Sequence, residues 1–67
     1  MSDICDRYPA APDYVGISET AAMAMGATGG VRVVERDGVS LPMLKNLDAN
    51  RVDLVVANGL VTYACRF

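Results

Sequence analysis

The distribution of apolar residues in the second half of the chain predicts β-strands. Residues 31–35 and 51–56 are rich in valine and carry partial alternation of apolar and polar positions, which is typical of half-buried strands. The second run is followed by Asn58-Gly59, the strongest short signal for a tight hairpin. We therefore expect residues 60–66 to fold back antiparallel on the strand before the turn.

A short helix is predicted ahead of these strands. Ser18 can cap it through its hydroxyl, and Glu19 would lie in the first turn, where the helix dipole favours an anion. Thr20 to Ala27 is rich in alanine and methionine, and Gly29-Gly30 should end the helix.

A helix this short is not stable alone, so one of its faces must pack on the strands. We expect Ala21, Ala22 and Met25 to form that face. Met23 and Met25 could suggest a soft-metal site, but methionines on a short helix more often fill gaps in a core, which is the interpretation adopted here.

Residues 1–14 contain Pro9 and Pro12 and show no periodicity, so they are interpreted as an extended N-terminal arm, followed by a single domain over residues 15–67. Tyr8 and Tyr14 would anchor the arm, and Tyr63 the last strand.

The connection from Arg36 to Asn50 is long for so small a domain, and such loops are often functional. Its apolar side chains either complete the core or bind a partner, and their pattern alone leaves both alternatives open. They are Leu41, Pro42, Met43, Leu44 and Leu47.

Length and charge exclude several classes of protein. A chain of 67 residues has room for one domain with a small core. The net charge of −2 and the absence of a basic cluster argue against nucleic acid or a membrane surface as partner. No apolar run approaches the roughly 18 residues of a membrane span. We also expect that the protein is a monomer and that it binds no cofactor and no metal.

The two cysteines, Cys5 and Cys65, lie near opposite ends of the chain. A disulfide between them would stabilise the fold by about 4 kcal/mol in the loop-entropy model, and two buried thiols are the alternative. The compartment depends on this choice: secretion is expected if the disulfide forms or a signal has been removed, and a cytoplasmic location otherwise.

Several of these segments together resemble the potato inhibitor I family of serine-protease inhibitors, which includes eglin and the barley chymotrypsin inhibitor. The matching segments are Tyr14-Val15-Gly16 before the Ser18-capped helix, Val31 to Val34, the loop entry Leu41-Pro42, and Asn50 to Val56 with its hairpin. The resemblance implies an α+β fold, in which one helix packs on a small mixed sheet and a long reactive loop joins two parallel strands.

The resemblance also implies a reactive bond between Lys45 and Asn46. The protease-binding loop would comprise Leu41, Pro42, Met43, Leu44, Lys45, Asn46, Leu47 and Asp48. A loop already held in the shape that a protease requires binds without a large ordering entropy, and its cut ends stay in place for religation. Arg51 would support the loop, because its guanidinium can donate several hydrogen bonds.

Three residues depart from the family pattern. Asp53 stands where the family often has a second supporting arginine, Leu44 stands where it usually has threonine, and Asp48 where it often has a cation. Our hypothesis is an inverted arrangement, in which Asp48 or Asp53 pairs with Arg51 or Arg36, and Arg51 and Asp53 are the predicted loop-support residues.

Lys45 predicts trypsin-like target enzymes, because a long cation suits a pocket with a carboxylate at its base. Subtilisin-like enzymes come second, since Met43 and Leu44 supply apolar contacts. A register shifted by one residue would make Leu44 the specificity residue and reverse this order.

The alternative function is a non-inhibitory interaction domain on the same scaffold, which the missing second arginine would favour. We expect no enzymatic activity, since the chain has no histidine and neither Ser18 nor Ser40 has an evident base.

Overall fold

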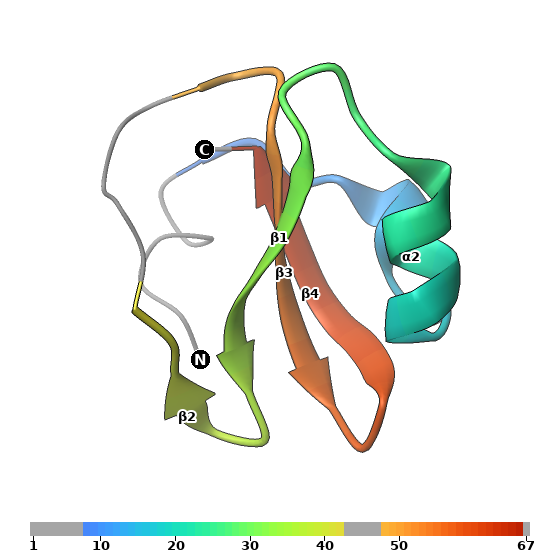
Figure 1. Ribbon diagram of the computed structural model, residues 1–67, viewed down its shortest axis with the longest axis vertical. Coiled ribbons are helices and arrows are strands. Elements are labelled where there is room, and N and C mark those ends of the chain that lie inside the picture. The colour runs from blue at the N-terminus through green and yellow to red at the C-terminus, as the bar shows by residue number, and fades with distance from the viewer. Residues whose placement is uncertain (1–7, 43–47, 67) are drawn as a thin grey trace.

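The computed structural model describes residues 8–42 and 48–66. It contains one α-helix beside a four-stranded mixed sheet with strand order β2-β1-β3-β4, which confirms the predicted α+β class (Figure 1). In chain order the elements are η1 (Pro12–Tyr14, a 3-10 turn), α2 (Glu19–Met25), β1 (Val31–Arg36), β2 (Val39–Ser40), β3 (Val52–Ala57) and β4 (Leu60–Arg66). In the part of the chain described, no helix is long and apolar enough to cross a membrane.

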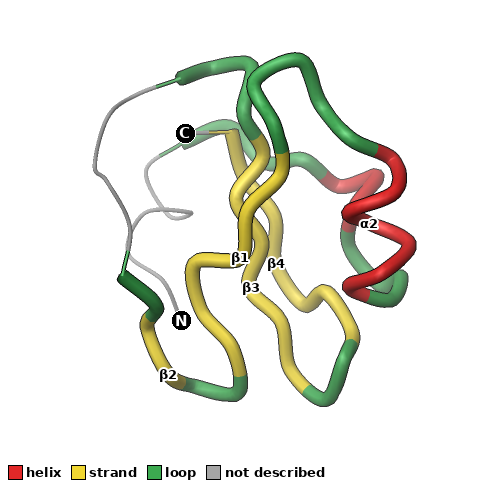
Figure 2. Tube along the Cα trace, in the orientation of Figure 1, coloured by secondary structure: helices red, strands yellow, loops and turns green. Residues whose placement is uncertain are grey.

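The centre of the sheet is a parallel pair. β1 and β3 run side by side with Val31 opposite Val52 and Arg32 opposite Asp53, while β4 pairs antiparallel with β3 (Figure 2). The parallel strands predicted to flank the long connection are therefore confirmed, and β1 and β3 each have a neighbouring strand on both sides.

Two tight turns close the lower end of the sheet in Figure 1. At Asn58 and Gly59 φ is 53° and 77°, and at Asp37 and Gly38 it is 52° and 81°. Positive φ at two successive residues matches the hairpin turn whose twist suits paired strands. The first turn was predicted, whereas the second and the short strand β2 lie inside the connection that was interpreted as a loop.

The helix begins where predicted and ends early. Ser18 Oγ accepts a hydrogen bond from the Ala21 backbone N at 3.0 Å, as expected of a cap. The helix ends at Met25 because Gly26, with φ of +66°, turns the chain away, so Gly29-Gly30 does not set its limit.

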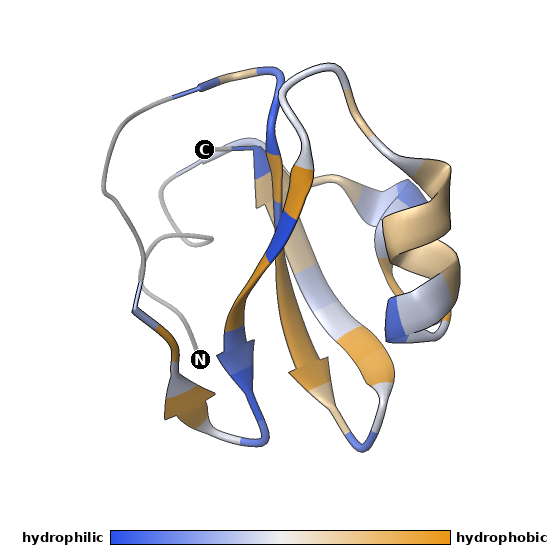
Figure 3. Ribbon diagram, viewed as in Figure 1, coloured by the Kyte–Doolittle hydropathy of each residue, from blue (hydrophilic) through white to orange (hydrophobic). Residues whose placement is uncertain are grey.

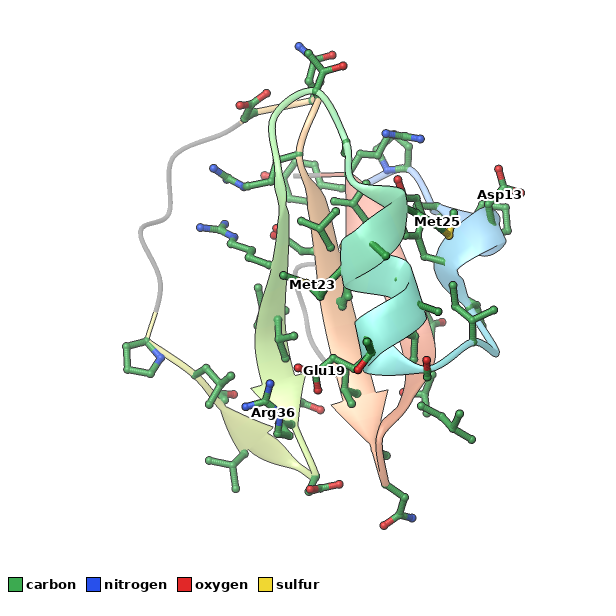
Figure 4. The ribbon with its side chains drawn as sticks, turned by 45° about the vertical axis from the view of Figure 1, so that its right-hand side comes forward. Asp13, Glu19, Met23, Met25 and Arg36 are labelled. Carbon is green, nitrogen blue, oxygen red and sulfur yellow. The ribbon has the colours of Figure 1, made fainter. Side chains whose placement is uncertain are left out.

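The helix contributes one small side chain to the core. Ala22 is completely buried, whereas Ala21 is exposed and Met23 and Met25 are 46% and 50% exposed. The predicted packing of Ala21, Met23 and Met25 is therefore wrong, and Figure 4 shows both methionines on α2. A helix of seven residues has only a narrow stripe toward the sheet, and the small side chain at its centre lets the backbone approach closely.

The main core lies between α2 and the sheet. All residues of β3 from Val52 to Val56 are buried, and Figure 3 shows β3 as the most continuously apolar strand. This agrees with a strand covered on both faces. The core comprises Ala11, Tyr14, Ala22, Val52, Leu54, Val56, Val61 and Ala64, and a second cluster consists of Val34, Val55 and Cys65.

The segment before the helix covers the outer edge of β4. Ala11 N donates to Ala64 O at 2.9 Å, and Gly16 N donates to Val61 O at 2.8 Å. Tyr14 is buried and its hydroxyl donates to Gly26 O at 2.6 Å, which confirms its role as an anchor. Tyr63 is 39% exposed and is not a core anchor. The covered edge cannot pair with another chain.

Substitutions at two leucines are expected to change the stability of the protein very differently, because Leu54 is buried and Leu60 is exposed. Leu54→Ala should lower the free energy of unfolding by about 2–5 kcal/mol, because it leaves a cavity under α2. Leu60→Ala, at a residue that is 51% exposed, is the matched control and should change stability by less than about 0.5 kcal/mol. Urea titration followed by circular dichroism compares the two, and equal losses would contradict this description of the core.

Candidate functional site

The connection that follows β2 begins from a fixed point on the sheet. Leu41 N donates a hydrogen bond to Val34 O at 2.9 Å, and Leu41 is half-buried while Pro42 is exposed. The next predicted site residues, including the reactive bond Lys45-Asn46, lie outside the described residues. These are Met43, Leu44, Lys45, Asn46 and Leu47.

At its other end the connection returns through a local turn. Asp48 Oδ1 accepts a hydrogen bond from Asn50 N at 2.9 Å, and its carbonyl accepts one from Arg51 N at 3.0 Å. A side-chain carboxylate that bonds the backbone two residues later replaces one backbone contact of the turn. Asp48, predicted as the last residue of the protease-binding loop, therefore also shapes the entry into β3.

This turn lies against the backbone before β1. Gly29 N donates to Asn50 O at 2.8 Å, and Val52 N donates to Gly30 O at 3.0 Å. A Cβ at Gly29 would lie 2.7 Å from Arg51 N and 2.8 Å from the Asp48 carboxylate. Glycine is needed here because the two backbone segments approach too closely for any side chain.

Directly below the turn lies a buried ion pair. Asp53 is completely buried, and its Oδ1 and Oδ2 accept hydrogen bonds from Arg32 Nε at 2.8 Å and Arg32 Nη2 at 3.3 Å. The two residues are direct partners in the parallel register of β1 and β3. The two-pronged contact is the strongest geometry available to an arginine and a carboxylate.

Arg51, which directly precedes β3, forms an ion pair with the same carboxylate. Its Nε lies 3.5 Å from Asp53 Oδ1, a distance for an ion pair rather than a good hydrogen bond, and its side chain is only 11% exposed. The hypothesis that Asp53 pairs with Arg51 is confirmed. Arg36 does not take part, because it binds Glu19 at 2.6 Å, as Figure 4 illustrates.

The three charged side chains lie on the sheet face opposite the helix. Val52, Leu54 and Val56 pack toward Ala22, so strand alternation directs Arg51 and Asp53 to the other face. Figures 1 and 4 both show the described ends of the long connection on that side of the sheet, across from α2. We call Arg32, Asp53 and Arg51 the arginine–aspartate cluster.

Cys65 lies on the same face as the cluster. It is completely buried in β4, opposite Asp53 in the antiparallel register, and it is not a free thiol. Cys5, its predicted partner, lies outside the described residues, so the pairing stays a prediction.

Arg32 and Gly29 were missed from the sequence. Arg32 interrupts one valine-rich run and Asp53 interrupts the other, and opposite charges within two buried parallel strands are a signal for a cross-strand pair. Gly29 was interpreted only as the end of a helix, and no local signal distinguishes that role from a close backbone approach.

No family model matches the sequence, and no curated protein or solved structure is significantly similar to it. Within residues 8–42 and 48–66, no three His, Cys, Asp or Glu side chains gather in a way that could hold a metal ion.

Gly29→Ala should destabilise the protein by about 1–3 kcal/mol, because the new Cβ forces the Asp48–Arg51 turn away from β1. Thr28→Ala, at the exposed neighbouring residue, is the control and should have little effect. Thermal unfolding measures both variants, and a Gly29→Ala protein as stable as the control would show that the turn can move without cost.

Asp53→Asn should lower the free energy of unfolding by about 3 kcal/mol, because it leaves two partly buried guanidinium groups without their shared counter-charge. Asp13→Asn makes the same chemical change at an exposed residue and should be nearly neutral. Urea titration tests this prediction, and a fully stable Asp53→Asn variant would mean that the ion pair contributes no net stability.

Proposed function

We propose that this protein is a serine-protease inhibitor that presents residues Leu41 to Asp48 as a substrate-like loop, with Lys45-Asn46 as the reactive bond. The observation that carries the proposal is the fixing of both described ends of the connection to rigid elements. The backbone of Leu41 is hydrogen-bonded to β1. The turn that begins at Asp48 is closed by a hydrogen bond from Arg51 N, and the turn accepts a further hydrogen bond from Gly29 N.

Fixed ends matter for inhibition in two ways. A loop whose ends cannot move loses less conformational entropy when a protease binds it, so the complex is tighter for the same contact area. After cleavage, the new ends remain anchored in a single scaffold, so religation competes with release. An ordinary flexible loop with the same residues would be a substrate.

The arginine–aspartate cluster, which lies next to the Asp48–Asn50 turn, supports the same proposal. Arg51 is largely buried beside Asp53, which restricts its side chain, and it follows directly after the Asp48–Asn50 turn. An arginine in this position can donate hydrogen bonds to carbonyl groups above the sheet. Residue 53 is an aspartate and not the second arginine that the family pattern often has. Arg32 from the neighbouring strand supplies a second guanidinium group in addition to Arg51.

Trypsin-like enzymes are the proposed targets. Lys45 is the one lysine in the sequence, and its cationic side chain suits a specificity pocket with a carboxylate at its base. Subtilisin-like enzymes are the second proposed class.

Titration of trypsin and of subtilisin with the purified protein tests this function. We expect stoichiometric inhibition of trypsin, with an inhibition constant that rises at least about 30-fold in Lys45→Ala, as for a central anchor residue. Arg66→Ala removes another cation at an exposed residue of β4 and is the control, which should inhibit like the unaltered protein.

Mass spectrometry of the mixtures locates any cut. Slow cleavage at Lys45-Asn46 in the inhibited complex would support the proposed register, and a cut after Leu44 with preference for subtilisin would shift it by one residue. Rapid digestion within the loop by both enzymes without inhibition would contradict the proposed function and favour the non-inhibitory interaction domain.

A further inference from the structure

We propose that Asn58 is a site of spontaneous deamidation, and that the modified residue loosens the contact between the β3–β4 turn and the start of α2. Asparagine is one of the thermolabile residues of proteins. The site lies at the end of the sheet that carries the two tight turns, and its chemistry is independent of the proposed inhibition of proteases.

The residue after Asn58 leaves the reacting nitrogen accessible. Gly59 has no side chain, and apart from its two chain neighbours no atom lies within 4 Å of the position that a Cβ would take. Its backbone nitrogen can therefore approach the side chain of Asn58, which is exposed to solvent. Glycine thus removes the steric barrier that a larger residue would place at this position.

The reaction needs only the chain and water. Gly59 N attacks Asn58 Cγ, and the new C–N bond closes a succinimide ring. The bond between Cγ and Nδ2 breaks, and Nδ2 leaves as ammonia with the proton that Gly59 N has lost. Water then opens the ring at one of its two carbonyl groups, which gives either aspartate or isoaspartate at residue 58.

The side chain of Asn58 is not held in place, unlike that of Asp37 in the neighbouring turn. Asp37 Oδ1 accepts a hydrogen bond from Asn58 N at 2.8 Å, so the carboxylate of Asp37 is fixed across the two turns. Within the described part of the chain, the side-chain amide of Asn58 forms no hydrogen bond. It can therefore rotate toward the nitrogen of Gly59.

Ring closure requires the turn to open locally. At Asn58 and Gly59 φ is 53° and 77°, and the peptide between them has to rotate out of this conformation before the two atoms can join. One hydrogen bond that opposes the rotation is that from Asn58 N to Asp37, and the other runs from Glu19 N to Gly59 O at 2.8 Å. The turn is exposed, and opening such a turn costs less free energy than unfolding the whole domain. The folded state therefore slows the reaction without preventing it.

Both products change the turn. Aspartate at residue 58 places a second carboxylate beside that of Asp37, and like charges on neighbouring residues repel. Isoaspartate adds a carbon atom to the backbone, so the two-residue turn loses the geometry that suits the paired strands. Because Gly59 O holds the backbone nitrogen of Glu19, the first residue of α2, either change reaches the start of the helix.

Deamidation is measured in the folded protein, kept in mildly alkaline buffer at physiological temperature. After unfolding, a protease that cuts after Arg51 separates Asn58 from Asn50, and mass spectrometry follows each fragment. Asn50 is the internal control, because the nitrogen that follows it belongs to Arg51 and donates to Asp48 O. We expect Asn58 to deamidate at least about tenfold faster than Asn50, since only glycine leaves the attacking nitrogen unshielded.

Hydrogen exchange at single backbone amides measures the effect on the helix. In the deamidated protein, Glu19 N should exchange at least about threefold faster than in fresh protein, because its acceptor lies in the altered turn. Leu41 N, which donates to Val34 O away from this turn, should keep its rate. Asn58→Gly keeps a residue that tolerates positive φ, and after the same incubation it should show neither a mass gain nor faster exchange.

Asn58→Asp isolates the contribution of charge. This variant should unfold at a lower urea concentration than the unaltered protein, and the shift should be smaller when Asp37→Gly removes the neighbouring carboxylate. Equal shifts in the presence and absence of Asp37 would overturn the part played by repulsion.

Two further outcomes would overturn the proposal. Equal deamidation of Asn58 and Asn50 in the folded protein, or modification of Asn58 in urea alone, would show that the folded turn is not a deamidation site. Deamidation of Asn58 without faster exchange at Glu19 would show that the turn does not act on α2. Failure to inhibit trypsin would remove the proposed function and has no bearing on either measurement.

Discussion

The ion pair between Arg32 and Asp53 is the interaction on which the arrangement of this small domain depends. It joins the two central parallel strands at residues that are directly opposite one another, and it places a completely buried carboxylate where only a fixed partner can satisfy it. Apolar side chains such as valine pack almost equally well in several registers, whereas a buried charge does not tolerate a slip. The hydrophobic residues thus supply most of the stabilisation, and the ion pair selects one alignment.

That alignment gives the sheet two different faces. On one face, Val52, Leu54 and Val56 pack against Ala22 and form the main core. On the other, the charged cluster lies beside a smaller apolar group that contains Val55 and Cys65. A domain of this size cannot build two extensive cores. Among the described residues, the second face therefore combines a small apolar group with ion pairs and hydrogen bonds, which are directional.

The parts of the fold that local chemistry determines were predictable from the sequence. The Asn58-Gly59 turn, the cap at Ser18 and the valine-rich strands each depend on residues close together in the chain. The buried face of the helix could not be predicted, because a helix of seven residues shows too little periodicity to distinguish Ala22 from its neighbours. The partner of Asp53 was missed for another reason: it lies on a strand 21 residues away, and only the parallel register brings the two together.

Asp53 illustrates why a charged residue in a strand has to be judged in three dimensions. Taken alone along β3, an aspartate in place of a supporting arginine is a loss of positive charge and of donors. Across the sheet, however, Asp53 recruits Arg32 and also contacts Arg51, so two guanidinium groups remain on the same face. The carboxylate restrains both of them, which a second arginine on β3 could not do because like charges repel. Two guanidinium groups can therefore be held on one face of a sheet from neighbouring strands, provided that a counter-charge lies between them.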